Sequence, residues 1–284
     1  MSLIDLQAFF GSHPLTKDAK IGAWWRFLRF QVVHSLLKTA RTYRYVDSSV
    51  LVVEKGMTGA TGNVYVGLHE FNDMAFVIHS LREGDLFVDI GANVGSYTVL
   101  ASAVAYASSI AIEPVPGSVT RLIRNIKANG IDKRVVIEPC ALGAVEGEVL
   151  FSLDADTVNQ VVDESYQGEY ASVRVSTLDA LIGDRHPLVM KIDVEGYEEQ
   201  MLAGAKKTMA SDGLQAVLIE DDSPNVRKQM LDYGFSEYSY DPFSRTLTLL
   251  DGRAAFNHLW IRDLKMIQER VRTASPFTVL RRQI

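Results

Sequence analysis

Acidic side chains stand at or near the ends of three apolar segments, and they are the strongest chemical signal in the sequence. Asp89 lies near the end of DLFVDI, Glu113 near the end of SSIAIEP, and Asp193 near the end of PLVMKIDV. Nearly continuous apolar runs of this kind are typical of strands that are covered on both faces of a parallel sheet. Because such strands end at the same edge, and ligands bind there, we expect the three carboxylates to line one site.

A glycine-containing turn follows the first of these segments. Gly91, Asn93 and Gly95 stand in it at alternate positions, just before the start of a predicted helix. Glycine lets the backbone approach a ligand closely, and the N-terminus of a helix offers free N–H groups. The turn is a poor cradle for a dinucleotide, because Asn93 and Ser96 replace two glycines of the G-x-G-x-x-G motif. Asp89 would also repel a diphosphate.

Glu113 follows Asp89 by 24 residues. A carboxylate at the end of the second strand of such a sheet can accept hydrogen bonds from both ribose hydroxyls of a nucleoside. The turn and the two acids therefore predict a nucleoside that carries an ammonium group and no phosphate, and S-adenosylmethionine fits that description. The plainer alternative is a structural turn beside a solvated glutamate.

Several segments together resemble the FkbM-like family of S-adenosylmethionine-dependent methyltransferases. The resemblance spans roughly residues 69–262, and its motifs are FVDIGANVGSYT (87–98), AIEPVPGSVTRLIRNIKANG (111–130), VSTLDALI (175–182), LVMKIDVEGYEEQMLAGA (188–205) and VLIED (217–221). It implies an α/β, Rossmann-like class I methyltransferase fold, with a seven-stranded, mostly parallel sheet, one antiparallel strand and helices on both faces. It also implies S-adenosylmethionine as methyl donor and O-methylation of a sugar, glycolipid or natural-product hydroxyl.

The resemblance extends the set of predicted cofactor contacts. Glu70 aligns with an acid of the family's entry segment, and we expect it near the methionine ammonium. The residues after the third strand fall where class I methyltransferases present backbone to the adenine, and the thiol of Cys140 is interpreted there as a small buried group. The predicted cofactor-binding residues are Glu70, Asp89, Gly91, Asn93, Gly95, Glu113, Cys140, Ala141 and Asp193.

Methyl transfer to an alcohol needs a base, because a hydroxyl group is a weak nucleophile. Asp193 and Glu195 are the first candidates, and Glu220 and His258 follow them. The alternative for the first pair is stabilisation of a helix N-terminus, where acidic side chains are favourable. Lys191 is interpreted as an ion-pair partner of a neighbouring acid.

The same acids allow a metal hypothesis. Asp193, Glu220 and Asp221 would offer the hard oxygen ligands that Mg²⁺ prefers, although their spacing is not diagnostic and we do not expect a metal. The alternative is that Asp221 is solvated or caps the next helix. Asp221 and Asn159, which lies in a polar segment that could cover the site, are the predicted contacts to the acceptor.

The remaining pattern divides the chain into three parts. We predict an N-terminal helical and β extension over residues 1–68, in which VLVVEKG and GNVYVG are β-rich. The methyltransferase domain covers residues 69–262 and includes a β insertion around 145–176. A C-terminal basic helix and tail occupies residues 263–284.

Composition limits the partners. The 284 residues have a net charge of −6, which argues against a nucleic-acid partner, and a single cysteine excludes an intrachain disulfide. We recognise neither a secretory signal nor an 18-residue apolar span, which predicts a cytoplasmic protein. Residues 1–46 hold seven Lys and Arg against two Asp, so the remainder carries −11.

The basic N-terminal part contains the segment Ile21–Leu37, IGAWWRFLRFQVVHSLL, whose apolar residues recur at helical spacing. With Trp24, Trp25 and its cations, this helix could lie at the inner face of a membrane as a peripheral contact. The alternatives are packing on its own domain or on a second chain in a homo-oligomer. Two rival functions also stay open: a catalytically silent nucleoside-binding module that docks on a membrane or assembly, and an NAD-linked oxidoreductase.

Overall fold

The apolar segments that end in acids form the middle of a large sheet. The computed structural model describes residues 3–37, 39–152, 161–163, 165–194, 196–250 and 257–284. The strands of the sheet are β3 (Leu86–Ile90), β4 (Ser108–Ile112), β5 (Val135–Glu138), β10 (Val189–Ile192), β11 (Ala216–Ile219), β12 (Ser236–Asp241), β13 (Thr246–Leu249) and β14 (His258–Ile261). Their order is β13-β12-β14-β11-β10-β3-β4-β5.

Strand direction confirms the predicted fold class. From β5 to β11 all neighbours are parallel, while β14 runs antiparallel between β11 and β12. Seven strands therefore have the expected mostly parallel arrangement with one reversed strand. The structure adds an eighth strand, β13, antiparallel to β12 at the edge of the sheet.

Side chains of the central strands alternate between two apolar clusters, one on each face of the sheet. In β3, Val88 and Ile90 belong to one cluster and Phe87 to the other. Alternation with period two is the geometry of a strand, and apolar residues at both phases explain the continuous runs in the sequence.

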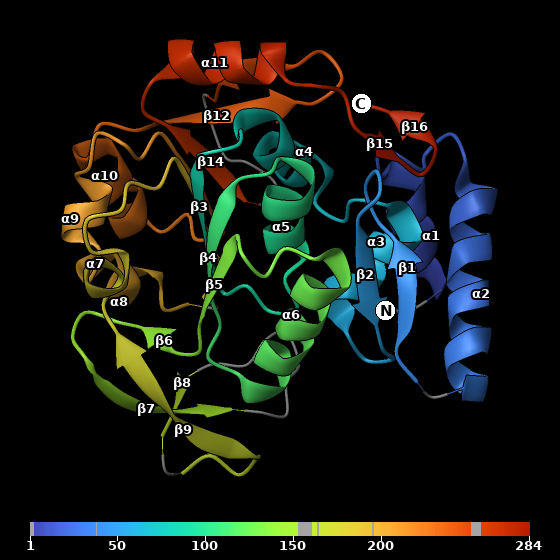
Figure 1. The fold of residues 1–284 in the computed structure, drawn as a ribbon, viewed down its shortest axis with the longest axis horizontal. Coiled ribbons are helices and arrows are strands. Elements are labelled where there is room, and N and C mark those ends of the chain that lie inside the picture. The colour runs from blue at the N-terminus through green and yellow to red at the C-terminus, as the bar shows by residue number, and fades with distance from the viewer. Residues whose placement is uncertain (1–2, 38, 153–160, 164, 195, 251–256) are drawn as a thin grey trace.

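Helices cover both faces, as Figure 1 shows. One face is covered by α4 (Phe71–Ser80), α5 (Ser96–Val99), the π-helical turn η1 (Leu100–Val104), α6 (Pro116–Asn129) and α11 (Leu264–Thr273). The other face is covered by α7 (Leu178–Ile182), α8 (Glu198–Ala203), α9 (Lys206–Met209) and α10 (Pro224–Asp232). α6 has favourable ends, since Pro116 opens it and Gly130 follows it with φ of 62°.

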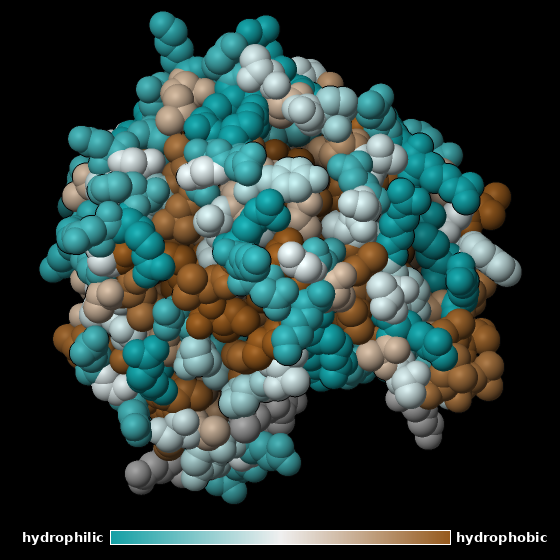
Figure 2. All heavy atoms as spheres, in the orientation of Figure 1, coloured by the Kyte–Doolittle hydropathy of each residue, from teal (hydrophilic) through white to brown (hydrophobic). Residues whose placement is uncertain are grey.

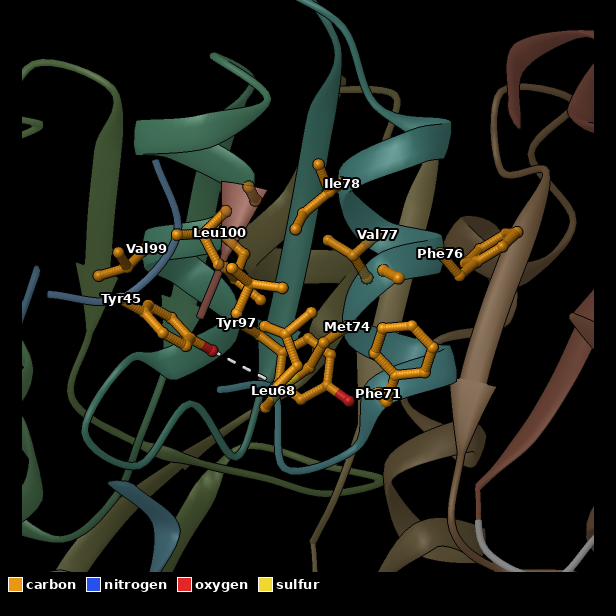
Figure 3. Packing of buried hydrophobic residues seen from close by; sticks show 14 of the residues in the cluster. Tyr45, Leu68, Phe71, Met74, Phe76, Val77, Ile78, Tyr97, Val99 and Leu100 are labelled. Carbon is orange, nitrogen blue, oxygen red and sulfur yellow. Dashed lines mark hydrogen bonds between the residues drawn. The ribbon is translucent and has the colours of Figure 1, made fainter. Parts of the chain in front are cut away.

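The N-terminal part packs into the cluster that also contains α4 and α5. Its elements are α1 (Leu3–Ser12), α2 (Lys20–Leu37), the hairpin of β1 (Arg41–Arg44) and β2 (Val50–Val53), and α3 (Thr58–Val66). Figure 3 shows Tyr45 and Leu68 close to Met74 of α4, and the Tyr45 hydroxyl lies 3.6 Å from the Met74 sulfur. This part of the chain therefore completes the core on one face of the sheet.

The β-rich prediction for GNVYVG is wrong, because this segment lies in α3. Val64, Tyr65 and Val66 are all buried, and α3 packs against α2 and β2. The Asn63 amide oxygen accepts a hydrogen bond from the backbone N–H of His69 at 2.8 Å, which fixes the end of the helix to the next segment. Tertiary packing thus overrides the strand preference of valine and tyrosine.

The C-terminal part returns to the N-terminal part. After α11, a short hairpin of β15 (Thr278–Val279) and β16 (Arg282–Gln283) follows, and Val279 forms a β-bridge with Val46. One apolar cluster takes side chains from all three predicted parts. The boundaries at residues 68 and 262 therefore coincide with no break in that cluster, and they stay a prediction.

A second, four-stranded sheet lies in the predicted β insertion. It consists of β6 (Ala141–Leu142), β7 (Gly147–Ser152), β8 (Val161–Val162) and β9 (Tyr170–Ser176), in the order β6-β9-β7-β8. The chain leaves the main sheet after Glu138 at Pro139, which has no N–H for a ladder hydrogen bond. The apolar run RVVIEPCAL therefore contributes β5 to the main sheet and β6 to the second sheet.

Two glycines in the turn after β3 are required by the protein itself. Gly91 has φ of +74°, and a Cβ there would lie 1.8 Å from the backbone oxygen of Asp193. Gly95 has φ of +86°, and its Cβ would lie 2.4 Å from the side chain of Leu122. The first glycine thus lets the ends of β3 and β10 meet, and the second lets α6 pack on the turn.

Gly91→Ala tests the close approach of these two strand ends. We expect it to lower the free energy of unfolding by more than about 4 kcal/mol, because the methyl group must displace a backbone oxygen. Gly84→Ala is the matched control, since Gly84 has φ of +90° and a Cβ there would meet no heavy atom within 4 Å. That change costs about 1–2 kcal/mol from the left-handed backbone alone. Urea denaturation measures both unfolding free energies. Equal losses in the two variants would contradict the role of the contact between Gly91 and the Asp193 backbone oxygen.

Candidate functional site

A cavity of about 330 Å³ lies beyond the carboxyl ends of β3, β4, β10 and β11. Its wall takes residues from the turn after β3, the segment after β5, the second sheet and the start of α4. The described residues that carry its charges are Glu70, Asp89, Glu113, Lys191, Asp193 and Glu220. Five carboxylates thus face one ammonium group, which favours a cationic ligand and opposes a polyphosphate.

Glu113 is fixed by the turn that it faces. Its carboxylate accepts a hydrogen bond from the backbone N–H of Asn93 at 2.8 Å and another from that of Val115 at 2.9 Å. Asn93 has φ of 49°, the left-handed conformation that asparagine tolerates better than most residues. Burial raises the pKa of Glu113 to about 7, although these two N–H groups oppose the shift. Both oxygens keep lone pairs with which they can accept hydroxyl groups of a ligand.

A second group of polar side chains surrounds Lys191. Its ammonium donates to the Asp193 carboxylate at 2.7 Å and lies 5.0 Å from the centre of the Tyr97 ring. Burial opposes the charge of Lys191, but the nearby carboxylates of Asp193, Glu70 and Asp89 outweigh it and raise the pKa of the ammonium. Lys191 is therefore the ion-pair partner of a neighbouring acid, Asp193, as the sequence interpretation expected.

Two further acids near this cation are held by hydroxyl groups. The Tyr97 hydroxyl donates to Glu70 at 2.6 Å, and the Thr98 hydroxyl donates to Asp89 at 2.6 Å. Asp89 is buried, and this burial raises the pKa of its carboxyl group. The helix that follows the glycine turn therefore supplies both donors and sets the orientation of both acids.

Glu220 differs from the other acids in its exposure and in its lack of a partner. It follows β11, is exposed, and forms neither a hydrogen bond nor an ion pair among the residues that the structure describes. Partial burial and then the charge of Asp193 raise its pKa. A carboxylate of this kind is suited to accept a proton from a bound molecule.

The remaining wall is apolar. Ile112, Pro114, Val115 and Leu142 line it, together with Phe151 of the second sheet. Cys140 is buried in the same wall, and its burial raises the pKa of the thiol. A flat aromatic base can be packed against such a surface, and a thiol of this kind is a poor nucleophile.

Comparison with protein families identifies the chain. A model of the FkbM methyltransferase domain matches residues 89–240, more than half of the sequence. The chain belongs to the FkbM methyltransferase family. The match confirms the resemblance that the sequence motifs indicated, and it includes the strand ends that supply most acids of the cavity.

Individual relatives of this FkbM methyltransferase are distant. The hexuronic acid methyltransferase AglP of Haloferax volcanii is 26% identical over 138 residues, which cover 48% of this chain and 56% of that protein. The match therefore covers less than two thirds of that relative's length. An FkbM methyltransferase structure from Methylobacillus flagellatus KT has a TM-score of 0.45 at 15% identity, over 84% of this chain and 59% of that one. The structure of the precorrin-6y C5,15-methyltransferase from Geobacter metallireducens GS-15 has a TM-score of 0.40 at 12% identity, over 74% of this chain and 92% of that one.

Most of the predicted site residues of this FkbM methyltransferase meet at the cavity. Those that line it are Glu70, Asp89, Gly91, Asn93, Glu113, Cys140, Ala141, Asp193 and Glu220. Their contact with a cofactor or acceptor stays a prediction. Gly95 does not line the cavity, and its role is the packing against Leu122.

Other predicted residues lie elsewhere. His258 is buried in β14 and hydrogen-bonds to Glu237, whose other oxygen forms an ion pair with Arg227 at 2.7 Å. Asp221 accepts hydrogen bonds from the backbone and hydroxyl of Ser223, and Ser223, not Asp221, is the N-cap of α10. Neither His258 nor Asp221 lines the cavity. Glu195 and Asn159 lie outside the described residues.

The metal hypothesis gains no support from the described part of the chain. Within it, no three His, Cys, Asp or Glu side chains are grouped closely enough to hold an ion. Asp193 is paired with Lys191, and Asp221 is occupied by Ser223.

Sequence reasoning missed Tyr97 and Asp73. Tyr97 lies inside the motif FVDIGANVGSYT and positions Glu70. Asp73, three residues after Glu70, receives a hydrogen bond from the Asn257 amide at 2.9 Å, and burial raises its pKa to about 7. The available signal was a second carboxylate in the first turn of an otherwise apolar helix, FNDMAFVIHS.

Glu113→Gln tests the electrostatics of the cavity through stability. The pKa of Glu113 is about 7 in the folded chain against 4.5 ordinarily, so folding favours its protonated form. Its stabilising contribution is complete below pH 4.5 and is lost as the pH rises through 7, by at most about 3 kcal/mol. Wild-type protein should therefore lose unfolding free energy relative to Glu113→Gln over this interval. If unfolding free energy changed with pH in the same way for both proteins, the raised pKa of Glu113 would be contradicted. Glu83→Gln, at an exposed position, is the control.

Proposed function

We propose that this FkbM methyltransferase transfers the methyl group of S-adenosylmethionine to a hydroxyl group of a sugar-containing acceptor. The observation that carries the proposal is the acid-lined cavity beyond β3, β4 and β10, with the Glu113 carboxylate anchored by the glycine turn. Family membership supports methyl transfer. The AglP match supports a sugar as acceptor, at 26% identity.

The residues of the cavity fit this cofactor. Glu113 would accept the ribose hydroxyls, and Glu70 and Asp89 would face the ammonium group. The apolar surface of Ile112, Val115 and Leu142 would pack on the adenine. When bound, S-adenosylmethionine supplies a methyl group made electrophilic by the adjacent sulfonium. A net negative cavity matches that positive charge.

Glu220 is the best-placed base for the acceptor hydroxyl. Asp193 already holds an ion pair with Lys191, whereas Glu220 is exposed and lines the cavity, and its raised pKa favours proton uptake. The proton of the acceptor hydroxyl would move to the Glu220 carboxylate as the oxygen attacks. Lys191 and Asp193 would instead hold the strand end and orient the acceptor.

The charge of the cavity also bears on the acceptor. Lys191 is the one Lys or Arg among the described lining residues, and Asp193 neutralises it. The carboxylate of a uronic acid would be repelled at the point of transfer. We therefore propose a sugar whose reacting hydroxyl lies away from any anionic group, and we do not transfer the hexuronic acid specificity of AglP to this chain.

Cofactor identity is tested by ligand-dependent stability. Saturating S-adenosylmethionine or S-adenosylhomocysteine, at about 100 times its dissociation constant, should stabilise the fold by about 2.7 kcal/mol, and NAD⁺ should not. Glu113→Ala should weaken the affinity for both adenosyl ligands by about 1–3 kcal/mol, since it removes a charged acceptor. Calorimetric titration measures this loss. Stabilisation by NAD⁺ alone would support the oxidoreductase alternative.

Glu220→Gln separates catalysis from binding. We expect kcat to fall by about 10²–10⁴-fold while the affinity for S-adenosylmethionine stays within about twofold, because only proton transfer is lost. The measurement is O-methyl product, detected by mass spectrometry, from a panel of neutral and uronic sugar glycosides. Glu199→Gln, at an exposed position of α8, is the control.

An unchanged kcat in Glu220→Gln would assign the base to another group. If wild-type protein bound the cofactor and methylated none of the panel, the silent binding module would become the better hypothesis.

A further inference from the structure

Helix α2 presents apolar side chains on two opposite faces. Its inner face packs in an aromatic cluster, in which Trp24 and Phe27 contact Phe10, and Phe27 and Phe30 contact Tyr65. Its outer face carries an apolar stripe of Ile21 (86% exposed), Trp25 (67%), Leu28 (52%), Val32 (56%) and Leu36 (77%). The spacing of three and four residues places these five side chains on one side of the helix.

Such a stripe is unusual on a helix in water. A helix that is apolar on both faces is normally buried on both. Figure 1 shows α2 at the margin of the molecule, and hydrophobic residues gather in Figure 2 at the lower right, where α2 ends. The stripe is therefore a surface that requires a partner, and contiguous apolar patches of this kind mark interaction sites.

Cations border the stripe. Arg29 is exposed beside it on the helix, Lys20 is exposed where the helix begins, and Lys17, Arg41 and Arg44 are exposed in the adjoining segments. Residues 1–46 carry seven Lys and Arg against two Asp, on a chain whose net charge is −6. The surface therefore suits a partner that offers an apolar region to the stripe and anionic groups to the bordering cations.

We propose that α2 lies in the interface of an anionic lipid bilayer, with the apolar stripe in the acyl region and the bordering cations at the headgroups. A second copy of the chain fits less well, because a symmetric contact through this face would bring the same cations together. No described helix is long and apolar enough to cross a membrane.

The helix is firmly connected to the cavity. α2 packs on α3, and the Arg26 side chain donates to the backbone oxygen of Tyr65 in α3 at 2.7 Å. Gly59, near the start of the same α3, lines the cavity. Docking of α2 would therefore hold the cavity near the bilayer surface, within reach of an acceptor attached to a lipid.

Vesicle binding without any methyl donor tests the proposal independently of catalysis. We expect the full chain to sediment with phosphatidylcholine vesicles that contain 30% phosphatidylserine and to stay in solution with pure phosphatidylcholine. Trp25→Glu/Leu28→Glu should weaken partitioning by about tenfold or more. Lys20→Gln/Arg29→Gln should weaken it by about fivefold for each cation lost, and high salt should act likewise. Leu231→Glu, at an exposed site on α10, is the matched control.

Three results would overturn the proposal. The first is that wild-type protein does not bind the anionic vesicles. The second is that both double variants bind these vesicles as strongly as wild type does. The third is that wild-type protein is a dimer in sedimentation and Trp25→Glu/Leu28→Glu converts it to a monomer. The last would assign the stripe to a second copy. Circular dichroism establishes that each variant is folded, and the charge variant changes only exposed side chains.

Discussion

The site depends on one close backbone contact, between Gly91 after β3 and the backbone oxygen of Asp193 after β10. Because no side chain separates them, the two strand ends meet, and Asp193 N–H bonds to the oxygen of Ile90 at 3.1 Å. The turn then continues through Asn93 in a left-handed conformation, which aims its N–H at Glu113. The position of the acids follows from this packing of main chain on main chain.

Three charged groups of the cavity are buried away from water. Glu113, Asp89 and Lys191 are buried, and each is held by specific donors or by an opposite charge. Burial of this kind opposes ionisation, while a bound cation would favour it. A positively charged molecule beside these carboxylates would therefore lower their pKa values again.

The sequence predicted what depends on periodicity and local chemistry. The buried strands, the glycine turn and the acids at the strand ends could be located because apolar runs and turn residues are local signals. Other features depended on distant contacts. Residues 62–66 are helical because α2 and β2 cover them, and the fold brings Glu237 beside His258 as its partner, with Arg227 paired to Glu237 in turn. Pairing of Lys191 was predictable from spacing, but the effect of Tyr97 on Glu70 required knowing which elements lie side by side.

The wall of the cavity does not come from the family-defining segment alone. Gly59, His69, Glu70 and Met74 all precede residue 89, where the match to the FkbM domain begins. The matched domain and one wall of the cavity thus lie in separate stretches of the chain. A change in the stretch before residue 89 would therefore alter this wall of the cavity and leave the central sheet as it is. The match to the FkbM domain therefore covers only part of the cavity wall.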